Sequence, residues 1–319
     1  MSAQMWDVVV VGGGPAGLSG ALMLGRARRR VLVIDAGEPR NRFTDAMHAV
    51  LGRDGTSPAQ LLADGRAEVE SYGGVIRHAT VSTVEHITDG FSLTLDESGA
   101  DPDAEGTVLA RRLLVATGSS DDLPDIPGLG DLWGRGVATC PYCDAYEVKD
   151  ARIGILATGP ASVMQAQLLR QWSESIIYVT HTSAAPVGEE AAGFAARGIQ
   201  VAVGPVECVL AEDSRLVGVQ LDGGRRIELD AIFTIPTLAP ADRTLRSLGA
   251  AIVENPVGAF VQVDATGRTS IDGVWAAGNV VNPAANVPIS IGAGALAGGA
   301  INHDLVLDDI ARVLARSAQ

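Results

Sequence analysis

In this sequence of 319 residues, two cysteines and an aspartate have the residue types and spacing that could perform redox chemistry. Cys140 and Cys143 are separated by two residues, and Asp144 follows directly. This spacing can place two sulfur atoms within disulfide reach, and the thiolate is the nucleophile in disulfide exchange. A neighbouring carboxyl group can donate and accept the protons that the exchange moves. The pattern therefore predicts redox chemistry at this pair.

Two other roles for the cysteine pair are open on the sequence alone. A structural zinc site would need two further ligands, and neither Cys208 nor the five scattered histidines supply a second paired motif. A pair of inert buried thiols is the other alternative, because free cysteine often acts as a small core residue. We expect no metal site, and we expect Cys208 to be a core residue.

A glycine pattern near the N-terminus predicts a dinucleotide site. Gly12, Gly14 and Gly17 have the spacing at which the first glycine permits a tight turn, the second admits a pyrophosphate and the third lets a helix pack on a sheet. Asp35 stands at the end of the next apolar run, where an acidic side chain can bind a ribose hydroxyl. On these residues alone the dinucleotide is either FAD or NAD.

The elements that must position these residues form two strand–helix–strand units. In the first, residues 7–11 are a β-branched run, and the glycine turn leads into a helical segment at 18–28. In the second, an apolar run at 152–157 leads through another turn to a strand at 176–180. We therefore predict an α/β protein with two Rossmann-like nucleotide-binding domains, the second inserted in the first.

The domain boundaries follow from a change in composition. A stretch rich in Gly, Pro and Asp at residues 121–136 marks a linker into the inserted domain. The predicted first domain is discontinuous and covers residues 1–118 and 246–319. The predicted inserted domain covers residues 119–245 and carries the cysteine pair.

Composition and charge exclude several classes of protein. With 24 Lys plus Arg against 38 Asp plus Glu, the net charge of −14 argues against nucleic-acid binding, which depends on basic side chains. Residues 273–303 carry no charged side chain, but the Asn and Pro residues among them argue against a membrane span. The N-terminus shows no secretory signal and three cysteines are too few for a disulfide framework, so we expect a cytoplasmic protein.

The order of these motifs resembles the low-molecular-weight thioredoxin reductase family. The resemblance also rests on residues 116–118 and 276–279, and it spans nearly the whole chain. It implies a homodimeric flavoprotein whose first domain binds FAD and whose inserted domain carries the redox cysteines and an NADPH site. It further implies that Cys143 contacts the flavin, that Cys140 meets the substrate and that Asp144 handles the proton.

The same resemblance implies where FAD is bound. Gly278 and Asn279 stand where the family usually has Gly-Asp, next to the ribityl and phosphate region. Asparagine keeps a hydrogen-bonding side chain without the charge, so we expect binding to survive. The helix that follows is expected to point its N-terminus at the flavin. The implied FAD-binding residues are Gly12, Gly14, Pro15, Ala16, Gly17, Asp35, Ala36, Arg40, Asn41, Ala116, Thr117, Gly118, Gly278, Asn279 and Ile289.

The inserted domain departs from the family pattern at its NADPH site. Ala157 replaces the first glycine of the second glycine motif, and Thr-His-Thr-Ser at residues 180–183 replaces a basic cluster. Phosphate groups are held by close backbone approach and by Arg or Lys charge. We therefore expect NADPH binding to be weak.

Together with this departure, the Cys-Pro-Tyr-Cys-Asp-Ala-Tyr-Glu stretch at residues 140–147 and the Asp-Ala-Gly-Glu-Pro-Arg-Asn stretch at residues 35–41 resemble one branch of the family. This branch comprises the dithiol oxidases that close disulfides in small natural products such as holomycin and gliotoxin. By that resemblance, a small-molecule dithiol reduces the Cys140–Cys143 disulfide, electrons pass to FAD, and O2 takes them up to give hydrogen peroxide. The alternative is a thioredoxin-disulfide reductase that uses NADPH or another donor. A regulatory flavin- or nucleotide-binding protein with silent cysteines is a third hypothesis. His48 is a further candidate near the flavin or the substrate, although a single histidine is more often structural.

Overall fold

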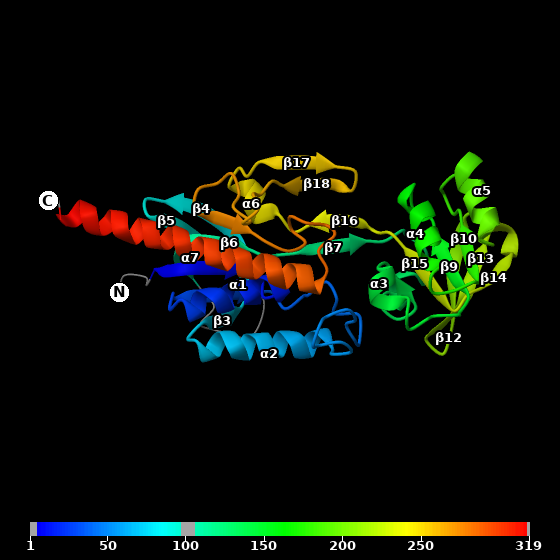
Figure 1. Ribbon diagram of the computed structural model, residues 1–319, viewed down its shortest axis with the longest axis horizontal. Helices are drawn as coiled ribbons and strands as arrows, with labels where there is room; N and C mark the ends of the chain where they lie inside the picture. The colour runs from blue at the N-terminus through cyan, green and yellow to red at the C-terminus, as the bar shows by residue number, and fades with distance from the viewer. Residues whose placement is uncertain (1–4, 97–105, 318–319) are drawn as a thin grey trace. The chain divides into compact units, whose positions relative to one another are not determined.

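The computed structural model describes residues 5–96 and 106–317. The chain divides into two compact units, each assembled from separated segments (Figure 1). The first comprises Met1–Arg42, Pro58–Ser120 and Leu238–Gln319, and the second comprises Phe43–Ser57 and Asp121–Thr237. The sequence predicts boundaries after residues 118 and 245, whereas the two units divide after Ser120 and Thr237. The segment Phe43–Ser57, which carries His48, groups with the second unit, and no sequence signal predicts this.

The first unit is built on a sheet in the order β3-β2-β1-β6-β5-β4, in which β19 is a further neighbour of β6. β5 pairs antiparallel with β4 and β6, and the other pairs are parallel. The long strand β6 contacts β5 near its start and β19 near its end, so β19 returns the C-terminal part of the chain to the sheet. The strands are β1 (Trp6–Val11), β2 (Val31–Asp35), β3 (Val75–His78), β4 (Thr80–Ile87), β5 (Gly90–Asp96), β6 (Thr107–Val115) and β19 (Val274–Ala276).

Both faces of this sheet are covered. Val8 and Val10 of β1 pack in a core with α1, α2 and α7, whereas Val9 and Val11 pack with β4, β5 and α6. Since successive side chains of a strand point to opposite faces, burial of both faces gives a continuous apolar run. The helices are α1 (Pro15–Arg26), α2 (Pro58–Ser71), α6 (Arg243–Ser247) and α7 (Val287–Ser317), and β17 (Ile252–Asn255) pairs with β18 (Gly258–Val261).

Glycines let α1 and α7 lie directly against each other, as Figure 1 shows. A Cβ atom at Gly294 of α7 would lie 1.9 Å from the carbonyl oxygen of Ala16. A Cβ atom at Gly298 would lie 2.7 Å from the carbonyl oxygen of Gly20. Neither position has room for a side chain, so the two helices pack backbone to backbone.

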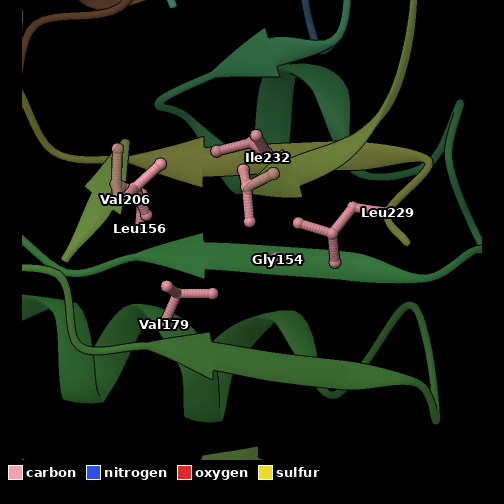
Figure 2. Close-up of a pocket in the computed structure, with 7 residues that line it drawn as sticks. Gly154, Leu156, Val179, Val206, Leu229 and Ile232 are labelled. Carbon is pink, nitrogen blue, oxygen red and sulfur yellow. The ribbon is translucent and has the colours of Figure 1, made fainter. Parts of the chain in front are cut away.

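The second unit holds a parallel sheet in the order β11-β10-β9-β15-β8. The antiparallel sheet of β12, β13 and β14 packs on one face of it, and α4 and α5 pack on the other. A small cavity between the two sheets has a wholly apolar lining, so it offers no polar group to a ligand (Figure 2). Cys208, expected in the core, lies on β12 and is only partly buried.

The remaining elements complete the second unit and its connections. Strands β7 (Ser119–Asp122) and β16 (Thr237–Pro240) are the stretches where the chain leaves the first unit and returns, and they pair with each other. The other strands are β8 (Val137–Ala138), β9 (Ile153–Leu156), β10 (Ile176–Val179), β11 (Gln200–Ala202), β12 (Val206–Glu212), β13 (Arg215–Leu221), β14 (Arg226–Glu228) and β15 (Ala231–Thr234). The helices are α3 (Pro141–Asp144), α4 (Ala161–Leu169) and α5 (Gly188–Ala196), with the 3-10 turns η2 (Gly130–Leu132) and η3 (Asp222–Gly224).

Candidate active site

The carboxyl ends of four parallel strands meet at one edge of the first unit's sheet. Val11 at the end of β1 pairs with Ile34 of β2 and with Val115 of β6, and β19 ends beside β6. Ligands of open parallel sheets bind outside the carboxyl ends of the strands. Strand register thus brings together motifs that are far apart in the sequence. One residue after these paired positions, Val11, Ile34, Val115 and Ala276, the chain has Gly12, Asp35, Ala116 and Ala277.

The three glycines of the N-terminal motif differ in what surrounds them. Gly12 has a φ of +107°, and a Cβ atom there would lie 2.4 Å from the carbonyl oxygen of Ala116. A Cβ atom at Gly17 would lie 1.9 Å from the carbonyl oxygen of Gly12, so the fold itself requires both glycines. A Cβ atom at Gly14 would meet nothing within 4 Å. The space beside Gly14 is therefore open to a ligand, as expected for the position where a pyrophosphate approaches the backbone.

The start of α1 supplies groups that suit an anion. Gly14 is the N-cap of α1, and Pro15 and Ala16 begin the helix. No side chain caps this end. Pro15 has no amide hydrogen, so the amides of Ala16 and Gly17 are the first that the helix can offer to a phosphate. The open space at Gly14 lies directly at this helix end, and the two features together fit the pyrophosphate of a dinucleotide.

Asp35 is held in place at the edge of the same cradle. Its carboxylate accepts hydrogen bonds from the amides of Gly13 at 3.3 Å and Gly37 at 3.1 Å, and from the Arg66 guanidinium at 2.9 Å. Because a carboxylate offers about four lone-pair positions, one remains for a ribose hydroxyl. Sequence reasoning missed Arg66, which lies on α2 and has no local signal. It also missed Gly13, where a Cβ atom would lie 2.4 Å from Asp35 Cγ.

Asn279 organises the loop that leads into α7. Its Nδ2 donates to the carbonyl oxygens of Asn282 at 3.0 Å and Ala285 at 2.9 Å, while its Oδ1 faces Arg40 Nη1 at 3.5 Å. An aspartate could make neither donation. Gly278, just before it, packs on the start of α1, since a Cβ atom there would lie 3.1 Å from Ala16 Cβ. Asparagine at 279 is therefore suited to this loop.

The other predicted FAD-binding residues fall into separate groups. Ala36, Arg40 and Asn41 follow β2, and Ile289 lies half-exposed in the first turn of α7. Thr117 and Gly118 fasten the returning segment instead. The Thr117 hydroxyl donates to the carbonyl of Ala241 at 2.7 Å, and the Ala241 amide donates to the carbonyl of Gly118 at 3.0 Å.

The cysteine pair lies at the start of α3 in the second unit. Cys140 precedes the helix and Cys143 lies in it, and the two sulfur atoms form a disulfide across a Cα–Cα distance of 5.3 Å. The amides of Cys143 and Asp144 both donate to the carbonyl of Cys140, which closes the turn. Both cysteines are partly exposed, so the disulfide is accessible within this unit.

Asp144 has an unusual carboxyl group. Its pKa is raised from 3.8 to about 6, because burial and, to a smaller extent, the charge of Glu147 raise it more than His48 lowers it. A group with a pKa close to neutrality exchanges protons readily at physiological pH. The predicted role of Asp144 therefore has physical support in its surroundings.

His48 lies in this second unit, beside the turn that follows the cysteine pair. Its Nε2 is 3.4 Å from Glu147 Oε1 and its Nδ1 is 3.5 Å from Asp54 Oδ2. Sequence reasoning included Glu147 only as part of the cysteine stretch and predicted no role for either carboxylate. Glu147 stands three residues after Asp144, which could have indicated a shared helix face. Asp54 had no comparable signal.

An aromatic pair flanks the disulfide. Tyr142, between the two cysteines, is 66% exposed, and its ring meets the edge of Trp172 with centroids 5.8 Å apart. Trp172 packs on the core beneath α4. An exposed aromatic ring within the redox turn offers an apolar surface to a substrate.

The carboxyl end of β10 is closed by its own neighbours. Thr180 Oγ1 accepts a hydrogen bond from the Gly204 amide at 3.1 Å, and His181 Nδ1 accepts one from the Val206 amide at 3.1 Å. Burial lowers the pKa of His181, which keeps its imidazole neutral near pH 7. Residues 180–187 include no Lys or Arg. The position at which the family places a basic cluster thus carries no positive charge from this stretch.

Comparison with known proteins identifies the family to which the chain belongs. Residues 6–297 match the pyridine nucleotide-disulphide oxidoreductase family, so the chain belongs to that family and is an oxidoreductase. Members of this family typically depend on a flavin. Within the described residues, no helix is long and apolar enough to cross a membrane, and no group of three or more His, Cys, Asp or Glu side chains could hold a metal ion.

Individual relatives are similar over nearly their whole length. The thioredoxin reductase tcpT of Claviceps purpurea is 29% identical, and the match covers 96% of each chain. The crystal structure of HlmI matches with a TM-score of 0.91 at 40% identity, covering 98% of this chain and 96% of that one. An oxidoreductase from Agrobacterium tumefaciens gives 0.88 at 34% identity over 95% of this chain and 99% of that one. The predicted thioredoxin reductase-like family and its two-domain Rossmann-type α/β fold are confirmed.

Proposed function

We propose that the protein is an FAD-dependent dithiol oxidase that closes a disulfide in a small-molecule dithiol. The observation that carries the proposal is the closed end of β10, where Thr180 and His181 serve neighbouring backbone amides and no basic side chain follows. NADPH recognition normally uses a basic side chain near this position for the 2′-phosphate. A redox disulfide without such a site draws its electrons from a thiol substrate instead.

The proposed exchange balances at the cysteine pair. A substrate thiolate attacks the Cys140 sulfur, the disulfide bond breaks, and Cys143 leaves as a thiolate. The second substrate thiol then attacks the substrate sulfur of the mixed disulfide. The two substrate sulfurs form the product disulfide, and Cys140 leaves. Two electrons and two protons move from the substrate to the pair. Asp144, largely ionised at pH 7 with a pKa of about 6, accepts a proton from an attacking thiol.

FAD fits the cradle of the first unit. The space beside Gly14 and the uncapped start of α1 would take the pyrophosphate, and Asp35 would bind a ribose hydroxyl. The start of α7, where Ile289 lies, would stabilise negative charge on the ring system. When bound, FAD would supply a two-electron acceptor for the reduced cysteine pair and a donor to O2, with hydrogen peroxide as the product.

The second candidate is a thioredoxin-disulfide reductase. The relative tcpT carries the name thioredoxin reductase, and that name favours this candidate. Such an enzyme would run the same exchange in reverse and would take its electrons from NADPH or another donor. Its substrate would be a protein disulfide.

We also infer that the protein is a homodimer. Leu307, Ile310 and Leu314 of α7 are 55%, 51% and 65% exposed and lie on one helix face. Arg111 holds the opposite face through Asp308 and Asp309. A large exposed apolar stripe is typical of an interface. Light scattering that measured the mass of a single chain at working concentration would refute this inference.

Oxygen uptake in the presence of a small dithiol tests the proposed activity. We expect one hydrogen peroxide and one disulfide product for each O2 consumed, without added NADPH. A protein that consumes no oxygen with any of a panel of small dithiols, but oxidises NADPH when a thioredoxin is present, would be the reductase.

A further inference from the structure

Four titratable side chains gather beside the cysteine pair, although they come from two distant parts of the sequence. His48 and Asp54 lie on the segment Phe43–Ser57, and Asp144 and Glu147 lie on α3 and the turn after it. The His48 ring stands between the carboxylates of Asp54 at 3.5 Å and Glu147 at 3.4 Å. The proposed exchange uses only Asp144 among them, so the other three have no assigned role.

The segment that carries His48 is built to hold the ring in one orientation. Ala49, the next residue, has a φ of +58°, a conformation that a non-glycine residue adopts only when its surroundings impose it. Asp54 provides that support, because its Oδ1 accepts the Ala49 amide at 2.8 Å while its Oδ2 faces the His48 ring. The Met47 amide donates to the carbonyl of Thr56 at 2.9 Å, and the Met47 carbonyl accepts from the Gly55 amide at 2.8 Å, which closes the segment at its base. Such strain is often found at functional positions.

Glu147 and His48 act on Asp144 in opposite directions. Glu147 raises the pKa of the Asp144 carboxyl group by repulsion, and His48 lowers it by attraction. The one lysine of the chain, Lys149, lies over the ring of Tyr146 at 4.1 Å instead of pairing with this group. Asp54 faces His48 from the other side of the ring. Burial raises the pKa of Asp144 most, and Glu147 and His48 adjust that raised pKa in opposite directions.

We propose that His48 and Glu147 are positioning residues that together set when Asp144 gives up and takes back the proton of the thiol–disulfide exchange. The inference rests on the proposed redox role of Cys140 and Cys143. His48 keeps Asp144 ionised and ready to accept a proton from an attacking thiol. Glu147 opposes this effect, so that Asp144 holds the proton until it is transferred to the Cys143 thiolate.

An infrared titration measures the proton on Asp144 directly. The carboxyl band of Asp144 is isolated as the difference between the oxidised holoprotein and its Asp144→Asn variant, and it is followed from pH 4 to pH 9. We expect a midpoint near pH 6. His48→Gln should move the midpoint up and Glu147→Gln should move it down, each by roughly half a pH unit.

Matched variants separate this effect from a structural one. His48→Lys places a lysine ammonium group at this position and should hold the midpoint at or below the parent value, in contrast to His48→Gln. Glu189→Gln removes one exposed negative charge from α5 of the same unit and should leave the midpoint unchanged. Shifts of His48→Gln and Glu147→Gln in the same direction, or no shift in either, would overturn the proposal.

The titration does not depend on turnover, so the two proposals fail separately. If small dithiols gave no peroxide but the midpoints moved as expected, the dithiol oxidase would be wrong and the charge balance around Asp144 would stand. If peroxide formed while the midpoints stayed at the parent value, the oxidase would stand and the roles of His48 and Glu147 would be wrong.

Discussion

Cys143 can leave Cys140 only as a thiolate, so exchange at this pair depends on groups that manage a proton nearby. At the residue scale, the chain supplies Asp144 in the same helix as Cys143, and it adds Glu147 and the distant His48 around it. The disulfide is accessible and lies next to an exposed aromatic ring. These few side chains contain all of the thiol chemistry that the account requires.

Substitution of Cys143 tests whether the pair turns over. Cys143→Ser keeps a side chain of similar size but cannot form the disulfide, so we expect flavin content to be unchanged and kcat to fall ~10³-fold or more. Cys208→Ser is the matched control, because Cys208 lies on β12 and forms no disulfide. Its kcat should stay within about twofold of the parent. Both values come from peroxide release with a small dithiol, and sustained turnover by Cys143→Ser would refute the mechanism.

The raised pKa of Asp144 also predicts how stability depends on pH. Folding raises this pKa from 3.8 to about 6, so the native state binds the proton more tightly than the unfolded chain does. The stabilisation is fully present below pH 3.8 and is lost as the pH rises through 6. Removing the carboxyl group should therefore stabilise the native state most at high pH, where the buried carboxylate is ionised.

Asp144→Asn makes this prediction measurable. We compare the free energy of unfolding of the variant minus that of the parent at two pH values. This difference should be about 2 kcal/mol larger at pH 8 than at pH 4, allowing for partial screening by solvent. Urea unfolding at the two pH values gives the difference. A variant whose relative stability is the same at both would show that the pKa of Asp144 is not raised.

At the scale of elements, α1 has two tasks in this account, since its start lies at the proposed dinucleotide site and its length packs on α7. At Gly14, near the proposed ligand, a Cβ atom would meet no protein atom within 4 Å. At Gly294, where α7 packs on α1, a Cβ atom would overlap the backbone of Ala16. The two glycines should therefore respond to substitution in different ways.

Gly14→Val should fold normally and lose its flavin, because a Cβ atom there meets no protein atom within 4 Å but the side chain would occupy the place of the pyrophosphate. Gly130→Val is the control, since a Cβ atom at Gly130 in η2 also meets nothing within 4 Å. Circular dichroism should be the same for both variants, and only Gly14→Val should be purified without flavin absorbance. A yellow Gly14→Val protein would remove FAD from this cradle.

Gly294→Ala should destabilise the protein by about 2 kcal/mol or more, because its Cβ atom would overlap the backbone of Ala16. Gly299→Ala, five residues later on the same helix, adds a Cβ atom that meets nothing within 4 Å, and it should stabilise the protein by up to about 1 kcal/mol through helix propensity. Urea unfolding measures both. Equal effects of the two substitutions would mean that α1 and α7 do not pack as described.

At the scale of the whole molecule, the sequence predicted what local pattern encodes. The glycine motif, Asp35 and the cysteine pair are each read from a few adjacent residues, and their structural positions agree with the expected strand ends and helix start. The salt bridge from Arg66 to Asp35 was not predicted, because it depends on how α2 packs. The approach of His48 to Glu147 was missed for the same reason, since it requires Phe43–Ser57 to join the other unit.

The central claim is that electrons enter from a dithiol and not from NADPH. The most direct measurement follows flavin absorbance of the purified protein without oxygen, first with NADPH and separately with a small dithiol, and then on admission of air. We predict bleaching by the dithiol alone, followed by return of the colour with release of peroxide. Rapid bleaching by NADPH would contradict the account and would identify a thioredoxin reductase-like enzyme that still binds NADPH despite Ala157.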